Sequence, residues 1–163
     1  MDTKQKETPP YALSSRQAQE SHFPTYAPDR SVLYYIDIPK GADTMTSCII
    51  VGLGGFVGSI LRYLIGLVPY EHSSGFPLKT FFINILGAFL IGAVAALAGR
   101  SSLSPRLALF LKVGICGGFT TFSSFALESQ QLVDKGSPVT AALYMGLSLF
   151  FGILACIAGQ KVV

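Results

Sequence analysis

The chain has 163 residues, of which half are hydrophobic and only 13% are charged, and its formal net charge is +3. Residues 1–45 contain five Lys or Arg and six Asp or Glu, and residues 46–163 contain seven and three, so the two parts carry −1 and +4. The sequence has no basic cluster, which argues against a nucleic-acid partner. The three cysteines lie in apolar stretches and their number is odd, which argues against a disulfide framework and gives no zinc spacing.

The change in composition near residue 45 predicts two parts. Residues 1–45 are polar and repeatedly interrupted by proline, so we expect a disordered N-terminal extension. Residues 46–163 form the second predicted part, a transmembrane domain.

Four apolar stretches follow one another in this second part, at residues 48–68, 80–99, 107–127 and 138–159. Each is close to the roughly 20 residues that an α-helix needs to cross the hydrocarbon core of a bilayer. The connections between them are short. The sequence therefore predicts an all-α integral membrane protein with four transmembrane helices.

The third of these stretches has an unusual centre, because it contains two adjacent glycines, two threonines and two serines. A glycine inside a helix costs roughly 1 kcal/mol relative to alanine, and β-branched threonine adds to this cost. Open backbone at membrane depth is tolerated only where protein or a water-filled cavity satisfies its polar groups. We therefore predict a broken third helix whose backbone has a ligand, with an ion as the first candidate.

The sequence contains no catalytic constellation and no cluster of metal-binding side chains, so it does not indicate an enzyme. The glycines between residues 52 and 58 lie inside a membrane span and do not follow a strand, which excludes a dinucleotide-binding motif. Gly54 and Gly58 are instead spaced for the close approach of another helix.

Neutral hydrogen-bonding side chains occur at helical spacing on two of the spans. Asn84 either cross-links two helices or uses its two amide donors to hold a small anion. Thr80 lies four residues before it, and Tyr144 and Ser148 have the same spacing on the fourth span, so each pair shares a helix face. Two such tracks of donors favour a pore lining.

Other residues have two readings. Phe122 and Phe125 pack in a core, or present ring edges with partial positive charge to an anion. Arg62 and Lys112 snorkel or pair with a neighbouring group, or attract an anion directly. Glu128 is either a solvated residue at a helix end or a group at the mouth of a pore.

The basic residues that flank the spans are almost evenly divided between the two sides. Lys40, Arg100, Arg106 and Lys161 would lie on one side, and Arg62, Lys79 and Lys135 on or near the other. Four against three is a weak bias under the positive-inside rule, which favours a chain that inserts in both orientations.

Taken together, these residues resemble the fluoride channels of the Fluc (CrcB) type over residues 48–160. Four motifs carry the resemblance: Gly54-Gly55-x-x-Gly58-x-x-x-Arg62-Tyr63, Thr80-Phe-Phe-Ile-Asn84-x-x-Gly87, Gly117-Gly-Phe-Thr-Thr-Phe-Ser-Ser-Phe125 and Tyr144-x-x-x-Ser148. The third motif is the most specific. Ser59, Ser124 and Lys79 stand where the family often has Ala, Thr and Gly, and none of these departures removes a group that the mechanism needs.

The resemblance implies a multi-pass protein of the plasma membrane that lets fluoride leave the cytoplasm passively and so reduces fluoride toxicity. It also implies an antiparallel, dual-topology homodimer with two pores, although a paralogous partner chain is the alternative. The implied pore residues are Asn84, Tyr144, Thr80, Ser148, Phe122 and Phe125. A structural sodium ion (Na+) would be held between the subunits by main-chain carbonyls of Gly117 and Thr120.

Two other functions compete with this one. A small four-helix, dual-topology exporter coupled to protons would need an acidic residue within a span, typically the first, where this chain has Arg62 and no carboxylate. A membrane scaffold that transports nothing would tolerate the loss of Asn84 or Phe122 without any change in fluoride tolerance.

Overall fold

The computed structural model describes residues 44–69 and 75–163, and all regular secondary structure within these ranges is helical. The predicted N-terminal extension falls on residues 1–43, outside the described residues. Its last two positions, Thr44 and Met45, belong instead to the first described helix.

Four helical segments are long and apolar enough to cross a membrane: α2 (Thr44–Gly66), α3 (Leu78–Gly99), the composite segment Pro105–Asp134 and α7 (Pro138–Val162). Their mean hydropathies are 1.9, 2.3, 1.4 and 2.1, and the shortest has 22 residues, which suffices to span a bilayer. The prediction of a multi-pass, all-helical membrane protein with four spans is confirmed.

The helices extend beyond the apolar stretches that predicted them. The first begins at Thr44 rather than at residue 48, and the third continues to Asp134 rather than ending at residue 127. Hydropathy follows only the apolar side chains, whereas helical hydrogen bonds continue through polar residues. In this last part Gln130 Nε2 donates to Asp134 Oδ1 at 2.9 Å, one turn further along.

The third span consists of four consecutive pieces, namely α4 (Pro105–Leu109), the π-helix η3 (Phe110–Cys116), α5 (Gly117–Phe119) and α6 (Phe122–Asp134). It begins with a favourable cap, because Ser104 Oγ accepts a hydrogen bond from the Leu107 N–H and Pro105 occupies the first turn. A π-helical turn is rare within an α-helix and often marks a functional site.

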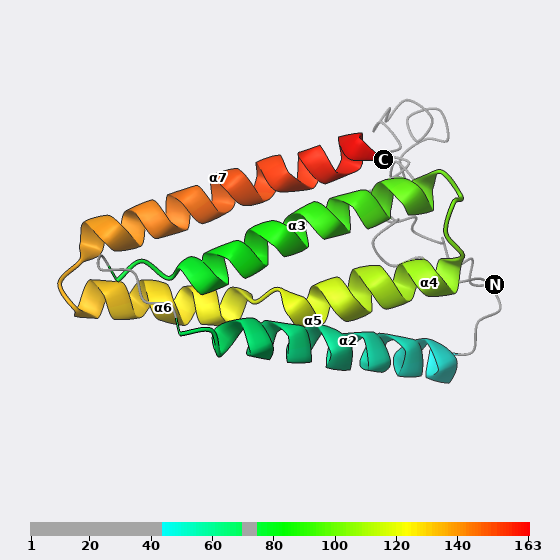
Figure 1. The fold of residues 1–163 in the computed structure, drawn as a ribbon, viewed down its shortest axis with the longest axis horizontal. Helices are drawn as coiled ribbons and strands as arrows, with labels where there is room; N and C mark the ends of the chain where they lie inside the picture. The colour runs from blue at the N-terminus through cyan, green and yellow to red at the C-terminus, as the bar shows by residue number, and fades with distance from the viewer. Residues whose placement is uncertain (1–43, 70–74) are drawn as a thin grey trace, which may run out of the picture. The chain divides into compact units, whose positions relative to one another are not determined.

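The spans pack in two close pairs, α3 along α7 and α2 along η3 and α5 (Figure 1). Glycines allow both approaches. A Cβ atom at Gly54 would lie 2.6 Å from the Phe110 carbonyl oxygen, and one at Gly58 would lie 2.8 Å from the Phe119 nitrogen. One at Gly159 would lie 2.9 Å from the Ala93 nitrogen. The prediction that Gly54 and Gly58 serve helix packing is confirmed.

A small buried cluster joins the ends of three spans. Its members are Leu132, Ala141 and Tyr144, with Phe76, Phe81 and Phe125 packed against them. Tyr144 is fully buried at 0% exposure. This cluster fixes the positions of α6, α7 and the start of α3 relative to one another, and the polar groups of the candidate site lie beside it.

Candidate functional site

The backbone is extended at two residues between α5 and α6. Thr120 has φ −75° and ψ 158°, and Thr121 has φ −150° and ψ 113°. The side chain of Asn84 on α3 binds the second of these residues at both backbone groups. Its Oδ1 accepts from the Thr121 N–H at 2.8 Å, and its Nδ2 donates to the Thr121 carbonyl at 3.2 Å. Asn84 therefore does cross-link two spans, and within residues 44–69 and 75–163 its second amide hydrogen is left for another acceptor.

This arrangement removes the helical donors from two carbonyl groups. In a continuous α-helix the carbonyl of Gly117 would accept from the Thr121 N–H, and that of Thr120 from the Ser124 N–H. The first of these N–H groups donates to Asn84 Oδ1 instead, and the second donates to Thr121 Oγ1 at 3.2 Å, which caps α6. Gly117 and Thr120 are the two residues whose carbonyls the resemblance assigns to sodium.

Glu128 connects the two predicted tracks of donors. Its Oε1 accepts from Thr80 Oγ1 on α3 at 2.7 Å, and its Oε2 accepts from the Tyr144 hydroxyl on α7 at 2.8 Å. Neither reading offered for Glu128, a solvated helix-end residue or a group at a pore mouth, included these two partners. The sequence contains one signal for such a role, because Glu128 is the only acidic residue between residues 72 and 133.

The two predicted phenylalanines have different surroundings. The Phe125 ring lies 5.1 Å from the Tyr144 ring and 5.6 Å from the Phe122 ring, so it packs beside the buried cluster. Phe122 is 77% exposed in the single chain. The pair therefore reaches from the protein interior to its surface.

Four of the six predicted pore residues surround one cavity of about 240 Å³. The residues that line it are Asn84, Thr120, Thr121, Phe122, Phe125, Ser148 and Leu149. Ser148 Oγ is buried and has no hydrogen-bond partner within the part of the chain that the structure describes. A buried hydroxyl without a partner is costly, so this group is suited to a polar ligand.

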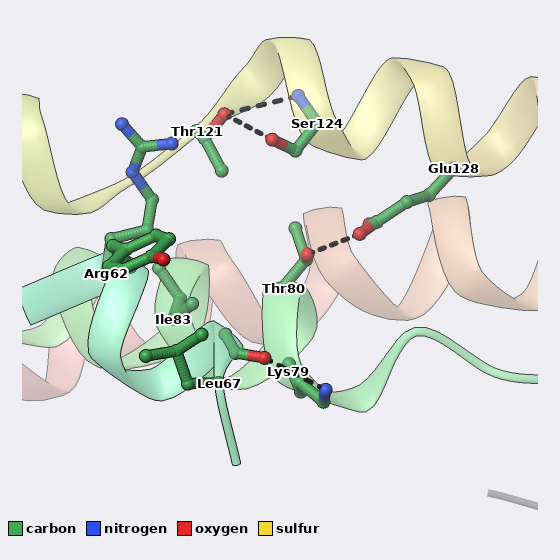
Figure 2. Close-up of a pocket in the computed structure, with 10 residues that line it drawn as sticks. Arg62, Leu67, Lys79, Thr80, Ile83, Thr121, Ser124 and Glu128 are labelled. Atoms are coloured by element: carbon green, nitrogen blue, oxygen red, sulfur yellow. Dashed lines mark hydrogen bonds between the residues drawn. The ribbon is translucent and has the colours of Figure 1, made fainter. Parts of the chain in front are cut away.

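A second cavity of about 430 Å³ shares Thr121 with the first, since this residue lines both. Figure 2 shows it with Arg62, Lys79, Thr80, Ser124 and Glu128 among its lining residues. Arg62 Nε donates to the Gly118 carbonyl at 3.1 Å, which agrees with the pairing reading for this residue. The lining contains two cations and one carboxylate that already accepts two hydrogen bonds, so its formal charge is positive and suits an anion.

Comparison with known proteins agrees with this geometry. Residues 49–160 match the protein family described as CrcB-like protein, Camphor Resistance (CrcB). The chain belongs to this family. A relative from Chlorobium chlorochromatii is 44% identical over 118 residues, which cover 72% of this chain and 92% of the relative. One from Thermus thermophilus is also 44% identical over 118 residues, covering 72% of this chain and 94% of the relative.

A third relative, from Shewanella halifaxensis, is 42% identical over 120 residues, covering 73% of this chain and 97% of the relative. All three relatives carry the name Fluoride-specific ion channel FluC. The matched region contains all four CrcB motifs and both cavities, and it omits the N-terminal extension. The similarity to the Fluc (CrcB) type is confirmed, and the relatives are channels rather than enzymes by name.

Proposed function

We propose that this CrcB protein is a fluoride-selective channel through which fluoride leaves the cytoplasm passively. The observation that carries the proposal is the cavity beside Thr121. It brings together the Ser148 hydroxyl, which has no partner among the described residues, the second amide hydrogen of Asn84 and the rings of Phe122 and Phe125. All of these groups are neutral, and each can present a positive hydrogen or ring edge to an anion.

Neutral donors suit conduction better than a fixed cation. Fluoride is small and strongly hydrated, so a pore must replace its water with close, compact donors. Binding must also remain weak enough for the ion to leave. The hydroxyl of Ser148 and the amide of Asn84 meet both conditions, whereas a guanidinium in the same place would hold the anion. Chloride is larger, and we expect a narrow passage to reject it by size.

The second cavity supports the same path, because Thr80 and Glu128 line it and Glu128 accepts hydrogen bonds from the hydroxyls of Thr80 and Tyr144. Arg62 and Lys79 attract the anion to this wider space. The anion then moves past Thr121, which borders both cavities, from the cationic side chains of the wider cavity to the neutral groups of the narrower one.

We further propose that the working unit is a homodimer of two oppositely inserted chains with two pores. The broken third helix and the exposed Phe122 support a second chain at this face. An ion path beside the Phe122 ring must be separated from lipid, and a second chain packed on this ring would separate it. The near balance of basic residues on the two sides supports insertion in both orientations.

A structural sodium ion fits the interruption in the third span. The carbonyls of Gly117 and Thr120 lack their helical donors, and carbonyl oxygens are the ligands that a hard cation prefers. The bound ion would compensate the partial negative charge of these carbonyl oxygens at the centre of the dimer. Arg62, on the neighbouring Gly118 carbonyl, leaves these two oxygens to the ion.

The test is fluoride efflux from liposomes that contain the purified full-length chain, followed with a fluoride electrode after addition of valinomycin. Chloride-loaded liposomes and a Phe122→Ile variant serve as controls. We expect rapid efflux of fluoride, no efflux of chloride, and a large loss of fluoride efflux in the variant. A folded wild-type dimer that passes no fluoride would refute the channel, and unchanged efflux from Phe122→Ile would refute the pore position of this ring.

A further inference from the structure

Phe76 lies outside the four motifs and lines neither of the two cavities. Its ring nevertheless contacts the ring of Tyr144, one of the predicted pore residues. It stands in the short segment Gly75–Pro77 that leads into α3. Two backbone hydrogen bonds hold this segment against the helix, from Leu78 N–H to the Phe76 carbonyl at 2.8 Å and from Phe81 N–H to the Pro77 carbonyl at 3.0 Å. The backbone at Phe76 is therefore tied to the start of α3.

The ring of Phe76 forms one wall of the site that holds Tyr144. The two ring centroids are 5.3 Å apart and the rings meet at 81°, an edge-to-face contact. The Phe125 ring lies against Tyr144 at 5.1 Å and 53°. Phe81 supports Phe76 in turn, at 5.6 Å and 71°. Tyr144 is thus held between one ring from the proposed pore and one from the segment before α3.

This contact matters because the hydroxyl of Tyr144 is rigidly attached to its ring. The hydroxyl donates to Glu128 Oε2 at 2.8 Å, so a tilt of the ring would move it away from the carboxylate. Glu128 would then keep the bond from Thr80 on Oε1 and lose the donor on Oε2. An exposed carboxylate oxygen repels an anion, and Glu128 lines the wider cavity.

We propose that Phe76 is a positioning residue for anion passage, which acts by holding the Tyr144 hydroxyl on Glu128. The proposal rests on the channel function proposed above. It makes two separate claims, that Phe76 sets the hydrogen bond of Tyr144 and that this hydrogen bond sets the rate of fluoride passage. Each claim has its own measurement.

The rate is tested in a double-mutant cycle of Phe76→Ala and Tyr144→Phe, by fluoride efflux from liposomes. Since an aromatic contact of this kind changes a rate by roughly twofold to tenfold, we expect Phe76→Ala to slow efflux by that factor. In the Tyr144→Phe background the same substitution should have almost no further effect, because the hydroxyl is already absent. Phe82→Ala, on an α3 side chain that is 55% exposed, is the matched control and should leave efflux unchanged.

A purely structural role for Phe76 would give the same loss in both backgrounds, and this result would overturn the proposal. So would a Phe76→Ala variant with wild-type efflux.

The hydrogen bond is tested by infrared difference spectroscopy of the purified chain, in which Tyr144→Phe identifies the C–O band of this one tyrosine. We expect Phe76→Ala to shift that band and Phe82→Ala to leave it in place. An unshifted band in Phe76→Ala would overturn the positioning claim even in a protein that conducts. If wild-type protein fails to conduct, the channel proposal and the effect on rate are both wrong, and the band still decides the positioning claim.

Discussion

Replacement of Ser148 by alanine should improve or preserve stability while it damages conduction. The Ser148 hydroxyl is buried in α7 without a hydrogen-bond partner among the described residues, and it borders the cavity that Asn84 and Phe125 also line. Most substitutions of buried polar residues in a protein lower both stability and activity. Opposite effects are expected here because the hydroxyl serves a ligand rather than the fold.

The expected changes in stability and in conduction follow from two states of this hydroxyl, one without a partner and one with fluoride bound. A buried polar group without a partner costs about 1–3 kcal/mol, so its removal should leave the free energy of unfolding unchanged or raise it by up to about 1 kcal/mol once the small void is counted. A hydrogen bond to a charged partner contributes about 1.5–3 kcal/mol, which corresponds to a loss of about 10- to 100-fold in the rate of fluoride passage.

Ser129→Ala is the matched control, because Ser129 is another helical serine, 6% exposed, whose hydroxyl does have a partner. Its Oγ donates to the Phe125 carbonyl at 2.7 Å. We expect Ser129→Ala to lower stability by about 0.5–1.5 kcal/mol and to leave conduction nearly intact.

Two measurements on both variants decide the matter: denaturant unfolding in detergent, and fluoride efflux from liposomes. The reasoning is refuted if Ser148→Ala is destabilised as much as Ser129→Ala, or if it conducts at the wild-type rate.

Two further experiments test the packing of α2 and the proposed sodium ion. Gly58→Ala should lower stability by about 1–3 kcal/mol, because its Cβ would collide with the backbone of η3 and α5. Gly52→Ala should instead leave stability unchanged or raise it by up to about 1 kcal/mol, because its Cβ meets no packing neighbour within 4 Å and alanine is the better helix former. Equal unfolding midpoints for the two variants would contradict the packing of α2. Replacement of sodium by N-methylglucamine at constant ionic strength should lower the thermal midpoint of the dimer, by the equivalent of about 2.7 kcal/mol if sodium was present at 100 times its Kd. A midpoint independent of sodium would rule out a structural ion on the Gly117 and Thr120 carbonyls.

The spans could be predicted from the sequence because the bilayer imposes a simple requirement. A stretch of about 20 apolar residues must be helical to satisfy its own backbone, so the absence of charge from residue 80 to residue 99 was enough to predict α3. The spacing of Gly54 and Gly58 likewise predicted the close approach of another helix. Local composition also indicated where the third span is weakest, and Thr120 and Thr121 have extended backbone at that place.

The partners of the polar side chains could not be predicted, because they come from residues far apart in the chain. Asn84 binds Thr121, 37 residues later, and Arg62 binds the Gly118 carbonyl, 56 residues later. Glu128 meets Thr80 and Tyr144 only because α3, α6 and α7 end beside one another.

The sequence by itself thus determined the membrane location, the four helices and the polar residues that share a helix face. Periodicity is a local property, and it assigns a residue to a helix face without saying what lies opposite. Only the tertiary structure decided that Ser148 has no partner among the described residues, that Thr80 and Tyr144 share one carboxylate, and that the ring of Phe76 packs against that of Tyr144. Those facts depend on which helix ends meet, and the packing of α3 with α6 and α7 sets them.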